Sequence, residues 1–354
     1  MTEDTKRQLR ILEEILQANE EQIHDVDFLV TKVREYGIVP FRWICELDEE
    51  IYATDNGMMQ IPGEFAAFCR YLTDLEIHSA AEVGVYRGRS SYFLCAILYR
   101  KCKDLVYDMI DITDALDEFE CFAKVLPCLR KQTEKTSSDF AGQGYDMVFI
   151  DADHGYEGSM EDYRNLGRYA RKVCCFHDIY AHEYDADGGG IVRTWKEVCI
   201  LTPQHPKYAF SHLPDRWMGI GVIENLHKKG GIGEDGDYEH VLEERTRFWK
   251  EIRECDKLFI YGARNDSRRM YDSLKALSCP VAGLVIGNET EYRDRVGEHK
   301  AYPVYFLENV AEEERAGIII CLRKTLREQA VAEIKAQDRK ERLILTDDRM
   351  AAFL

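Results

Sequence analysis

The stretch Ala80–Ser91 constrains the fold of this chain more than any other. It reads Ala-Ala-Glu-Val-Gly-Val-Tyr-Arg-Gly-Arg-Ser-Ser, and a helical pattern over 92–100 follows it. An apolar run, two glycines and a helical pattern in that order predict a β-strand, a tight turn and an α-helix. Gly84 can adopt a positive φ and, lacking a Cβ, lets a ligand approach the backbone. Gly88 and Ser90 come where the helix begins, and its free N–H groups can bind a carboxylate or a phosphate.

One acidic residue, Glu82, lies inside the apolar strand. A buried carboxylate is costly unless a cation pairs with it, and a ligand with an ammonium group would do so. The alternative is an ordinary strand–turn–helix unit of any doubly wound sheet, because glycine pairs of this kind are common. The acid favours a turn that binds a ligand.

This stretch resembles the first motif of the class I S-adenosylmethionine (SAM)-dependent methyltransferases. The motif is Glu-x-Gly-x-x-x-Gly-x-Ser, and Glu82, Gly84, Gly88 and Ser90 match it. The resemblance implies that these four residues hold the amino acid part of SAM.

Asp111 directly follows the next predicted strand, 105–110. An acid at this point, beyond a glycine turn, is placed to accept hydrogen bonds from ribose hydroxyls. The alternative is a turn or helix-cap residue, since Asp-Ile-Thr-Asp is also good capping chemistry. We favour the ribose role because of the glycine turn that precedes it.

Polar residues follow two further predicted strands: Asp151, Asp153 and His154 follow one, and His177 and Asp178 follow the next. Ligands of open α/β sheets bind at the carboxyl ends of the strands, so these side chains are candidates for one site. Two carboxylates suffice for Mg²⁺, which keeps several waters. A histidine is a less natural ligand of Mg²⁺, which leaves Mn²⁺, Zn²⁺ or no metal open. The alternative is a set of carboxylates that cap the following helices.

His154 is the candidate general base. A histidine has a pKa suited to taking a proton near neutral pH, and methyl transfer to oxygen requires that the hydroxyl loses its proton. A lone histidine is more often structural, but this one follows the candidate metal ligand Asp151 by three residues.

The resemblance extends over about Gly57–Glu224, to a methyltransferase branch that includes glycan and antibiotic-sugar O-methyltransferases. Four segments carry it in order: Phe149–Glu157, Phe176–Asp178, Gly190–Trp195 and Met218–Ile223. In metal-dependent relatives, residues matching Asp151 and the pair His177-Asp178 bind Mg²⁺, and a histidine matching His154 is the base. The first member of that pair is usually acidic there, so His177 is a departure.

Composition narrows the class of protein. The chain has 354 residues, 45% hydrophobic and 32% charged, as in globular proteins. Its formal net charge of −18 argues against nucleic acids and anionic membranes as partners. We expect no transmembrane helix and no signal sequence, because neither apolar pattern occurs. The 12 cysteines form no CxxC pair, which indicates a reduced, cytoplasmic setting without structural zinc.

We expect an α/β protein built from two Rossmann-like units. The predicted parts are a helical N-terminal extension (1–56), a methyltransferase domain (57–227) whose mostly parallel sheet ends in an antiparallel hairpin (208–213 and 218–223), a linker (228–236) and a smaller α/β domain (237–354). The N-terminal helices either form a cap or a contact in a homo-oligomer, or cover one side of the sheet. No clear third strand shows in 130–140.

The smaller domain resembles the Rossmann-like modules that accompany bacterial surface-glycan transferases. Of the dinucleotide pattern G-x-G-x-x-G it keeps Gly262, while Arg264 and Ser267 replace the other glycines. An arginine at the middle position blocks close approach of a pyrophosphate. We therefore expect an assembly or recruitment module that binds neither NAD nor FAD.

The function predicted from the sequence is SAM-dependent O-methylation of a hydroxylated small molecule, a sugar or glycan, with His154 as base and assistance from Mg²⁺ or Mn²⁺. The alternative is a non-catalytic SAM- or nucleotide-binding assembly protein that kept the fold.

Overall fold

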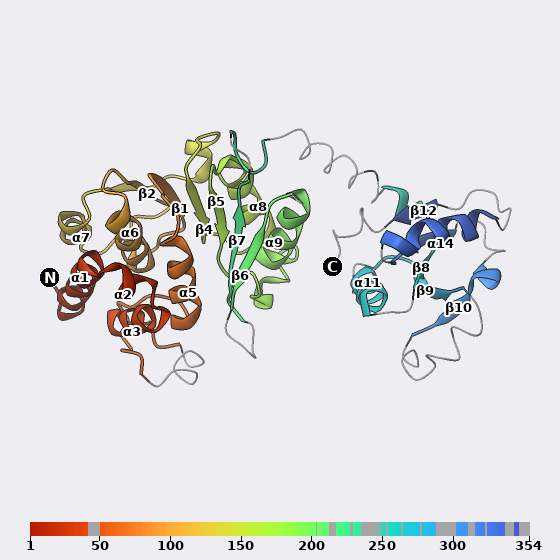
Figure 1. Cartoon of the computed structure of the whole chain (residues 1–354), viewed down its shortest axis with the longest axis horizontal. Helices are drawn as coiled ribbons and strands as arrows, with labels where there is room; N and C mark the ends of the chain where they lie inside the picture. The colour runs from red at the N-terminus through yellow and green to blue at the C-terminus, as the bar shows by residue number, and fades with distance from the viewer. Residues whose placement is uncertain are drawn as a thin grey trace. The chain divides into compact units, whose positions relative to one another are not determined.

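The computed structural model describes residues 1–41, 50–202, 204–211, 217–226, 229–234, 247, 250–252, 254–262, 265–276, 278–287, 302–310, 316–322, 324–336 and 343–346. The chain forms two compact units, Met1–Gly236 and Asp237–Leu354. Figure 1 shows the elements of each unit, which are described separately.

A seven-stranded sheet organises the first unit, with the strand order β3-β2-β1-β4-β5-β7-β6. The strands are β1 (Ser79–Val83), β2 (Val106–Asp111), β3 (Leu129–Thr133), β4 (Met147–Ile150), β5 (Val173–Phe176), β6 (Lys207–Phe210) and β7 (Ile220–Glu224). The first five are parallel, and β7 is antiparallel to both β5 and β6. The predicted α/β class and closing hairpin are thus confirmed. The hairpin folds back, so that its second strand lies next to β5 and its first forms the edge.

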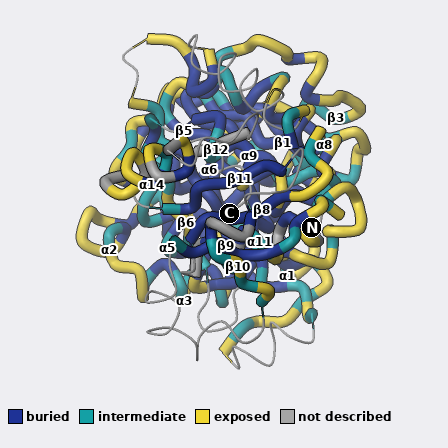
Figure 2. Tube along the Cα trace, turned by 90° about the vertical axis from the view of Figure 1, so that its right-hand side faces the viewer, coloured by how far each residue is buried: buried dark blue, intermediate teal, exposed yellow. Residues whose placement is uncertain are grey.

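Helices cover both faces of this sheet. They are α1 (Glu3–Gln17), α2 (Glu20–His24), α3 (Val26–Tyr36), α5 (Pro62–Leu72), α6 (Arg89–Lys101), α7 (Phe119–Val125), α8 (Tyr156–Asn165) and α9 (Gly190–Leu201), with short 3₁₀ turns η1 (Ser137–Phe140), η2 (Gly167–Tyr169) and η3 (His182–Tyr184). Figure 1 shows α5 and α6 on one side of the strands and α8 and α9 on the other. Every residue of β4 and β5 is buried, and Figure 2 shows buried chain inside a layer of exposed loops.

The third strand, β3, is the one that the sequence leaves unassigned. Its residues Leu-Arg-Lys-Gln-Thr are mostly polar, and Arg130 and Lys131 are exposed. Because β3 is an edge strand, it pairs only with β2 and needs no apolar face on both sides. The Gln132 side chain donates a 3.0 Å hydrogen bond to Asp108 on β2, which ties the polar strand to the sheet.

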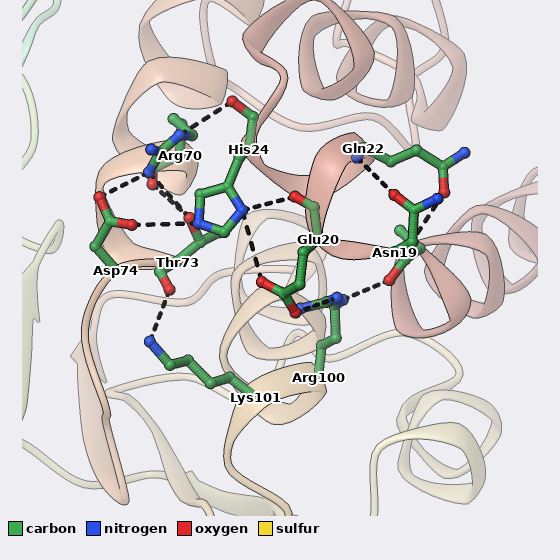
Figure 3. Close-up of polar contacts among 10 residues, drawn as sticks. Asn19, Glu20, Gln22, His24, Arg70, Thr73, Asp74, Arg100 and Lys101 are labelled. Atoms are coloured by element: carbon green, nitrogen blue, oxygen red, sulfur yellow. Dashed lines mark hydrogen bonds and ion pairs between the residues drawn. The ribbon is translucent and has the colours of Figure 1, made fainter.

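Within the predicted helical extension, residues 3–24 form two helices, α1 and α2. Asn19 separates α1 from α2 because it forms a capping box with Gln22. The Asn19 side chain accepts a hydrogen bond from the Gln22 N–H at 2.8 Å, and the Gln22 side chain accepts one from the Asn19 N–H at 3.0 Å. Figure 3 shows this box at the start of α2.

The N-terminal helices belong to the first unit. Ile11, Leu12 and Ile15 of α1 lie in the same hydrophobic core as Phe93 of α6. Polar contacts around α2 add to this packing, as Figure 3 shows. Arg100 on α6 donates to the carbonyl of Ala18 at 2.8 Å and to Glu20 at 2.7 Å, and Arg70 on α5 donates to the carbonyl of His24 at 3.0 Å.

The second unit holds a five-stranded parallel sheet with the order β10-β9-β8-β11-β12. Its elements are β8 (Lys257–Tyr261), α11 (Asn265–Ala276), β9 (Val281–Ile286), β10 (Val304–Phe306), η4 (Leu307–Val310), β11 (Ala316–Ile320), α14 (Lys324–Ala336) and β12 (Leu343–Thr346). It has two hydrophobic clusters of its own. In neither unit does a described helix combine the length and apolar character needed to cross a membrane.

The glycine motif of the second unit follows β8. Gly262 has a φ of +126°, and Ser267 in the first turn of α11 is fully buried. Arg264 lies outside the described residues.

Candidate active site

The glycine turn after β1 packs directly against the loop after β4. Gly84 has a φ of +88°, and a Cβ there would stand 2.2 Å from the carbonyl oxygen of Asp151 and 2.4 Å from the Cα of Ala152. Glycine is therefore required by backbone packing as well as by φ. The sequence suggested the close approach of a ligand; the structure shows the close approach of a second strand end.

Gly88 and Ser90 form the start of α6. Gly88 is the N-cap at a φ of +76°, and a Cβ on it would lie 2.8 Å from side-chain atoms of Leu116 and Tyr92. Ser90 lies in the first helical turn and is half-buried. No side chain caps this helix, so its first N–H groups keep their capacity to bind an anion.

Asp111, at the end of β2, holds the glycine turn. Its Oδ2 accepts from the N–H groups of Val85 at 3.0 Å and Tyr86 at 2.8 Å. Its Oδ1 accepts from the N–H of Thr113 at 2.8 Å and from the Thr113 hydroxyl at 2.9 Å. Four bonds match the accepting capacity of a carboxylate. The turn-and-cap role is therefore present, and the ribose contact stays a prediction.

Glu82 lies beneath the turn and has no solvent exposure. Its Oε2 accepts a hydrogen bond from the Tyr107 hydroxyl. Burial raises the pKa of Glu82 to about 8, although the bond from Tyr107 opposes the rise. The residue therefore holds a proton near neutral pH instead of the negative charge that we expected from the sequence.

Four predicted residues meet at the carboxyl ends of β4 and β5, which are neighbours in the sheet. Ligand atoms of Asp151, His154, His177 and Asp178 all lie within 4.8 Å of one another, and we call these four the Asp–His cluster. His177 Nδ1 is 3.2 Å from Asp151 Oδ1 and 3.4 Å from Asp178 Oδ1. His154 Nε2 is 2.7 Å from Asp178 Oδ2 and 3.7 Å from Asp151 Oδ1. Two of the side chains are almost fully buried: 4% of the His177 side chain and 8% of the Asp178 side chain is exposed to solvent.

Asp153 lies outside this cluster. It is exposed, and its Oδ1 accepts from the N–H of Gly155 at 2.8 Å, just before α8 begins. This bond lies within the loop and does not cap α8, whose N-terminus has no side-chain cap. Asp178 by contrast has a φ of +58°, a conformation that non-glycine residues adopt at a cost.

Charge in the Asp–His cluster is balanced internally. Burial opposes every charged form, yet the carboxylates raise the pKa of His154 to about 9 and that of His177 well above its usual range. The imidazoles in turn hold the pKa of Asp151 and of Asp178 low, against the effect of burial. In this state His154 keeps its proton at neutral pH. It can act as a base only when another positive charge offsets the two carboxylates.

The donor set of the cluster fits a divalent cation. Two carboxylates and two imidazoles converge from adjacent strand ends, and each offers an oxygen or nitrogen ligand atom within 4.8 Å of the others. Mixed nitrogen and oxygen donors suit Mn²⁺ or Zn²⁺ better than Mg²⁺, which prefers oxygen alone.

Sequence reasoning missed Tyr184 in η3. Its ring stacks on the imidazole of His154, with 4.6 Å between the ring centroids and 20° between the planes. No signal in the sequence marks it, because a tyrosine in a loop carries no pattern that points to a partner.

Comparison with known protein families finds one match in the first unit. Residues 81–179, which contain every predicted site residue, match a family described as a methyltransferase domain. No protein with a curated description is similar enough to match. The similar solved structures include the O-methyltransferase TomG from Streptomyces achromogenes (13% identity over 64% of this chain and 100% of that one, TM-score 0.36). They also include an O-methyltransferase from Bacillus cereus (11%, 61% and 96%, TM-score 0.38).

Proposed function

We propose that this chain transfers the methyl group of SAM to a hydroxyl oxygen of a small molecule of the sugar or glycan class, because residues 81–179 match a methyltransferase domain. The Asp–His cluster beside the glycine turn is the observation that carries the proposal. It brings paired carboxylates and a histidine to the edge of the sheet where ligands of this fold bind.

The glycine turn holds the cofactor in this proposal. Gly84, Gly88 and Ser90 lie against the amino acid part of SAM, with its carboxylate at the uncapped start of α6. Asp111 keeps the turn in shape and faces the ribose. Glu82 supports the turn from below through its bond to Tyr107.

The Asp–His cluster handles the acceptor. Asp151 and Asp178 would hold a divalent cation, which would supply Lewis acidity and so lower the pKa of an acceptor hydroxyl. His177 orients both carboxylates, because it lies within 3.4 Å of each. His154, once its own proton has passed to solvent, takes the proton from the hydroxyl. The rest of catalysis is alignment of the oxygen with the methyl group.

The test is methyl transfer from labelled SAM to a panel of sugars, polyols and phenols. Asp178→Asn should lower the rate by roughly 10²-fold or more, because it removes a cluster carboxylate. Asp153→Asn is the matched control: the same change two residues beyond Asp151, outside the cluster, should leave the rate near that of the unchanged chain. A chelator should abolish transfer, and Mn²⁺ or Mg²⁺ should restore it. Equal loss in both variants would contradict the proposal.

A non-catalytic SAM-binding protein is the second candidate. The internal charge balance of the Asp–His cluster favours it, because the two imidazoles offset the two carboxylates without a ligand. SAM binding by calorimetry without transfer to any acceptor, with or without added cation, would support this candidate.

A further inference from the structure

The position of His154 is fixed from three directions. Its carbonyl accepts a hydrogen bond from the N–H of Ile191 at 2.8 Å, which fixes the backbone. Its Nε2 edge faces the carboxylate of Asp178 at 2.7 Å. One face of its ring is covered by Tyr184, whose ring is nearly parallel to it at 4.6 Å between centroids. Two of these three contacts come from the segment between β5 and α9.

The backbone of that segment is shaped around Tyr184. Gly190 has a φ of +57°, and a Cβ there would stand 2.7 Å from the carbonyl oxygen of Tyr184 and 2.9 Å from its Cβ. The N–H of Asp187 donates to the same carbonyl at 2.9 Å. A side chain at position 190 would therefore push Tyr184 away, so the glycine is required by the place that the tyrosine occupies.

Core packing does not account for the stack. The His154 side chain is 24% exposed, and Tyr184 is only half-buried, so the pair removes less apolar surface from water than a core pair does. An aromatic face against an imidazole instead restricts rotation of the ring and so keeps Nε2 directed at the carboxylates.

We propose that Tyr184 is a positioning residue for His154: its ring, and not its hydroxyl, holds the imidazole in the orientation that faces Asp151 and Asp178. This inference rests on the proposed function for its catalytic consequence, but the orientation itself can be measured without any activity. Tyr184 contributes to the alignment of His154, the proton acceptor, because small displacements of such a group lower the rate strongly.

The first experiment is spectroscopic and uses the full chain with ¹³C-labelled histidine. The resonances of the His154 ring, assigned with His154→Gln, should be shifted upfield by the ring current of Tyr184. Tyr184→Phe should keep the shift and Tyr184→Leu should lose it. His182→Leu is the matched control, because His182 is exposed on the same short turn and pairs with Asp185 instead. An unchanged His154 shift in Tyr184→Leu would overturn the proposal.

The second experiment measures methyl transfer by the same variants. Tyr184→Leu should lower kcat by roughly 10–100-fold with little change in the KM for SAM, and Tyr184→Phe should restore the rate. Tyr184→Phe as slow as Tyr184→Leu would mean that the hydroxyl acts, which overturns the proposal. If the unchanged chain transfers no methyl group to any acceptor, the proposed function fails, while the His154 shift still decides the role of Tyr184.

A matched glycine pair tests the same contact without changing the tyrosine. Gly190→Ala should displace Tyr184 and remove the His154 shift, because its Cβ would meet the Tyr184 backbone. Gly188 has a similar positive φ of +72°, but a Cβ there would lie 3.3 Å from the Tyr156 side chain, a tight contact that does not involve Tyr184. Gly188→Ala should keep the shift. Loss of the shift in both variants alike would count against a specific support of Tyr184 by Gly190.

Discussion

The backbone of Gly84 lies so close to Asp151 that a Cβ on the glycine would stand 2.2 Å from the Asp151 carbonyl oxygen. The contact joins the end of β1 to the end of β4, and so fixes the glycine turn relative to the Asp–His cluster. A change at Gly84 is therefore a change to the fold as well as to the cofactor site.

Gly84→Ala should destabilise the first unit by about 2–4 kcal/mol, because it adds a steric clash with backbone to the cost of a positive φ. Gly142→Ala is the control: Gly142 has a φ of +78° and nothing within 4 Å of its Cβ position, so it carries the φ cost alone, about 1 kcal/mol. Urea unfolding of both variants measures the difference. Equal destabilisation would mean that the clash relaxes and that backbone packing does not explain the glycine.

Glu82→Gln should change how stability depends on pH. The folded pKa of Glu82 is about 8 and lies above the unfolded value of 4.5, so the folded state binds the extra proton between those values. The contribution of Glu82 to the free energy of unfolding is therefore greatest below pH 4.5 and is lost as the pH rises toward 8. Its slope is at most about 1.4 kcal/mol per pH unit.

Denaturation of both chains from pH 5 to pH 8 tests this expectation. The unchanged chain should lose stability relative to Glu82→Gln across that window, and the two curves should run parallel above pH 8. Only the difference matters, because the histidines of the Asp–His cluster titrate in both chains. Parallel curves throughout would show that Glu82 is ionised in the folded protein.

The sequence predicted the central elements of the first unit and their order. Buried parallel strands such as β4 and β5 are continuous apolar runs, and glycine turns and strand-end acids interrupt them at recognisable points. The edge strand β3 was not predicted from the sequence, because a strand that is paired on one side only can be polar. Asp151 could not be told from Asp153, because spacing does not say which acid turns toward the neighbouring strand end and which caps the loop.

Two features of the candidate site depend on tertiary contacts that no pattern carries. The proton on Glu82 follows from its complete burial against Tyr107, and the stack of Tyr184 on His154 joins two loops that follow different strands. The first contact joins the neighbouring strands β1 and β2 and the second joins two loops, so a local reading of residue types did not find them.

Asp111→Asn should weaken SAM binding by about tenfold, equivalent to about 1.4 kcal/mol. The amide accepts fewer hydrogen bonds than the carboxylate, so the N–H groups of Val85 and Tyr86 lose part of their support. Asp114→Asn is the control, because this nearby acid is bound to Lys131 and not to the glycine turn. Calorimetric titration with SAM measures both. An Asp111→Asn affinity equal to that of the control would show that the turn keeps its shape without the carboxylate.

The last prediction concerns the second unit, which should bind neither NAD nor FAD. A Cβ on Gly262 would stand 2.7 Å from the Ser267 Oγ and 2.8 Å from the Cys321 carbonyl oxygen. The buried Ser267 side chain thus fills the space beside the turn where the dinucleotide pattern has its third glycine. The unit has its own sheet and its own hydrophobic clusters. We therefore expect a shortened chain ending at Gly236 to keep its affinity for SAM.

Titrations of the full and shortened chains with NAD, NADP, FAD and nucleotide sugars, alongside SAM, measure this directly. SAM should bind both chains equally, and the other ligands should bind neither, because the buried Ser267 side chain stands at the position of the third glycine. Saturable micromolar binding of a nucleotide by the full chain alone would show that the second unit holds an active site of its own. Loss of SAM binding on shortening would instead show that the second unit supports the cofactor site of the first.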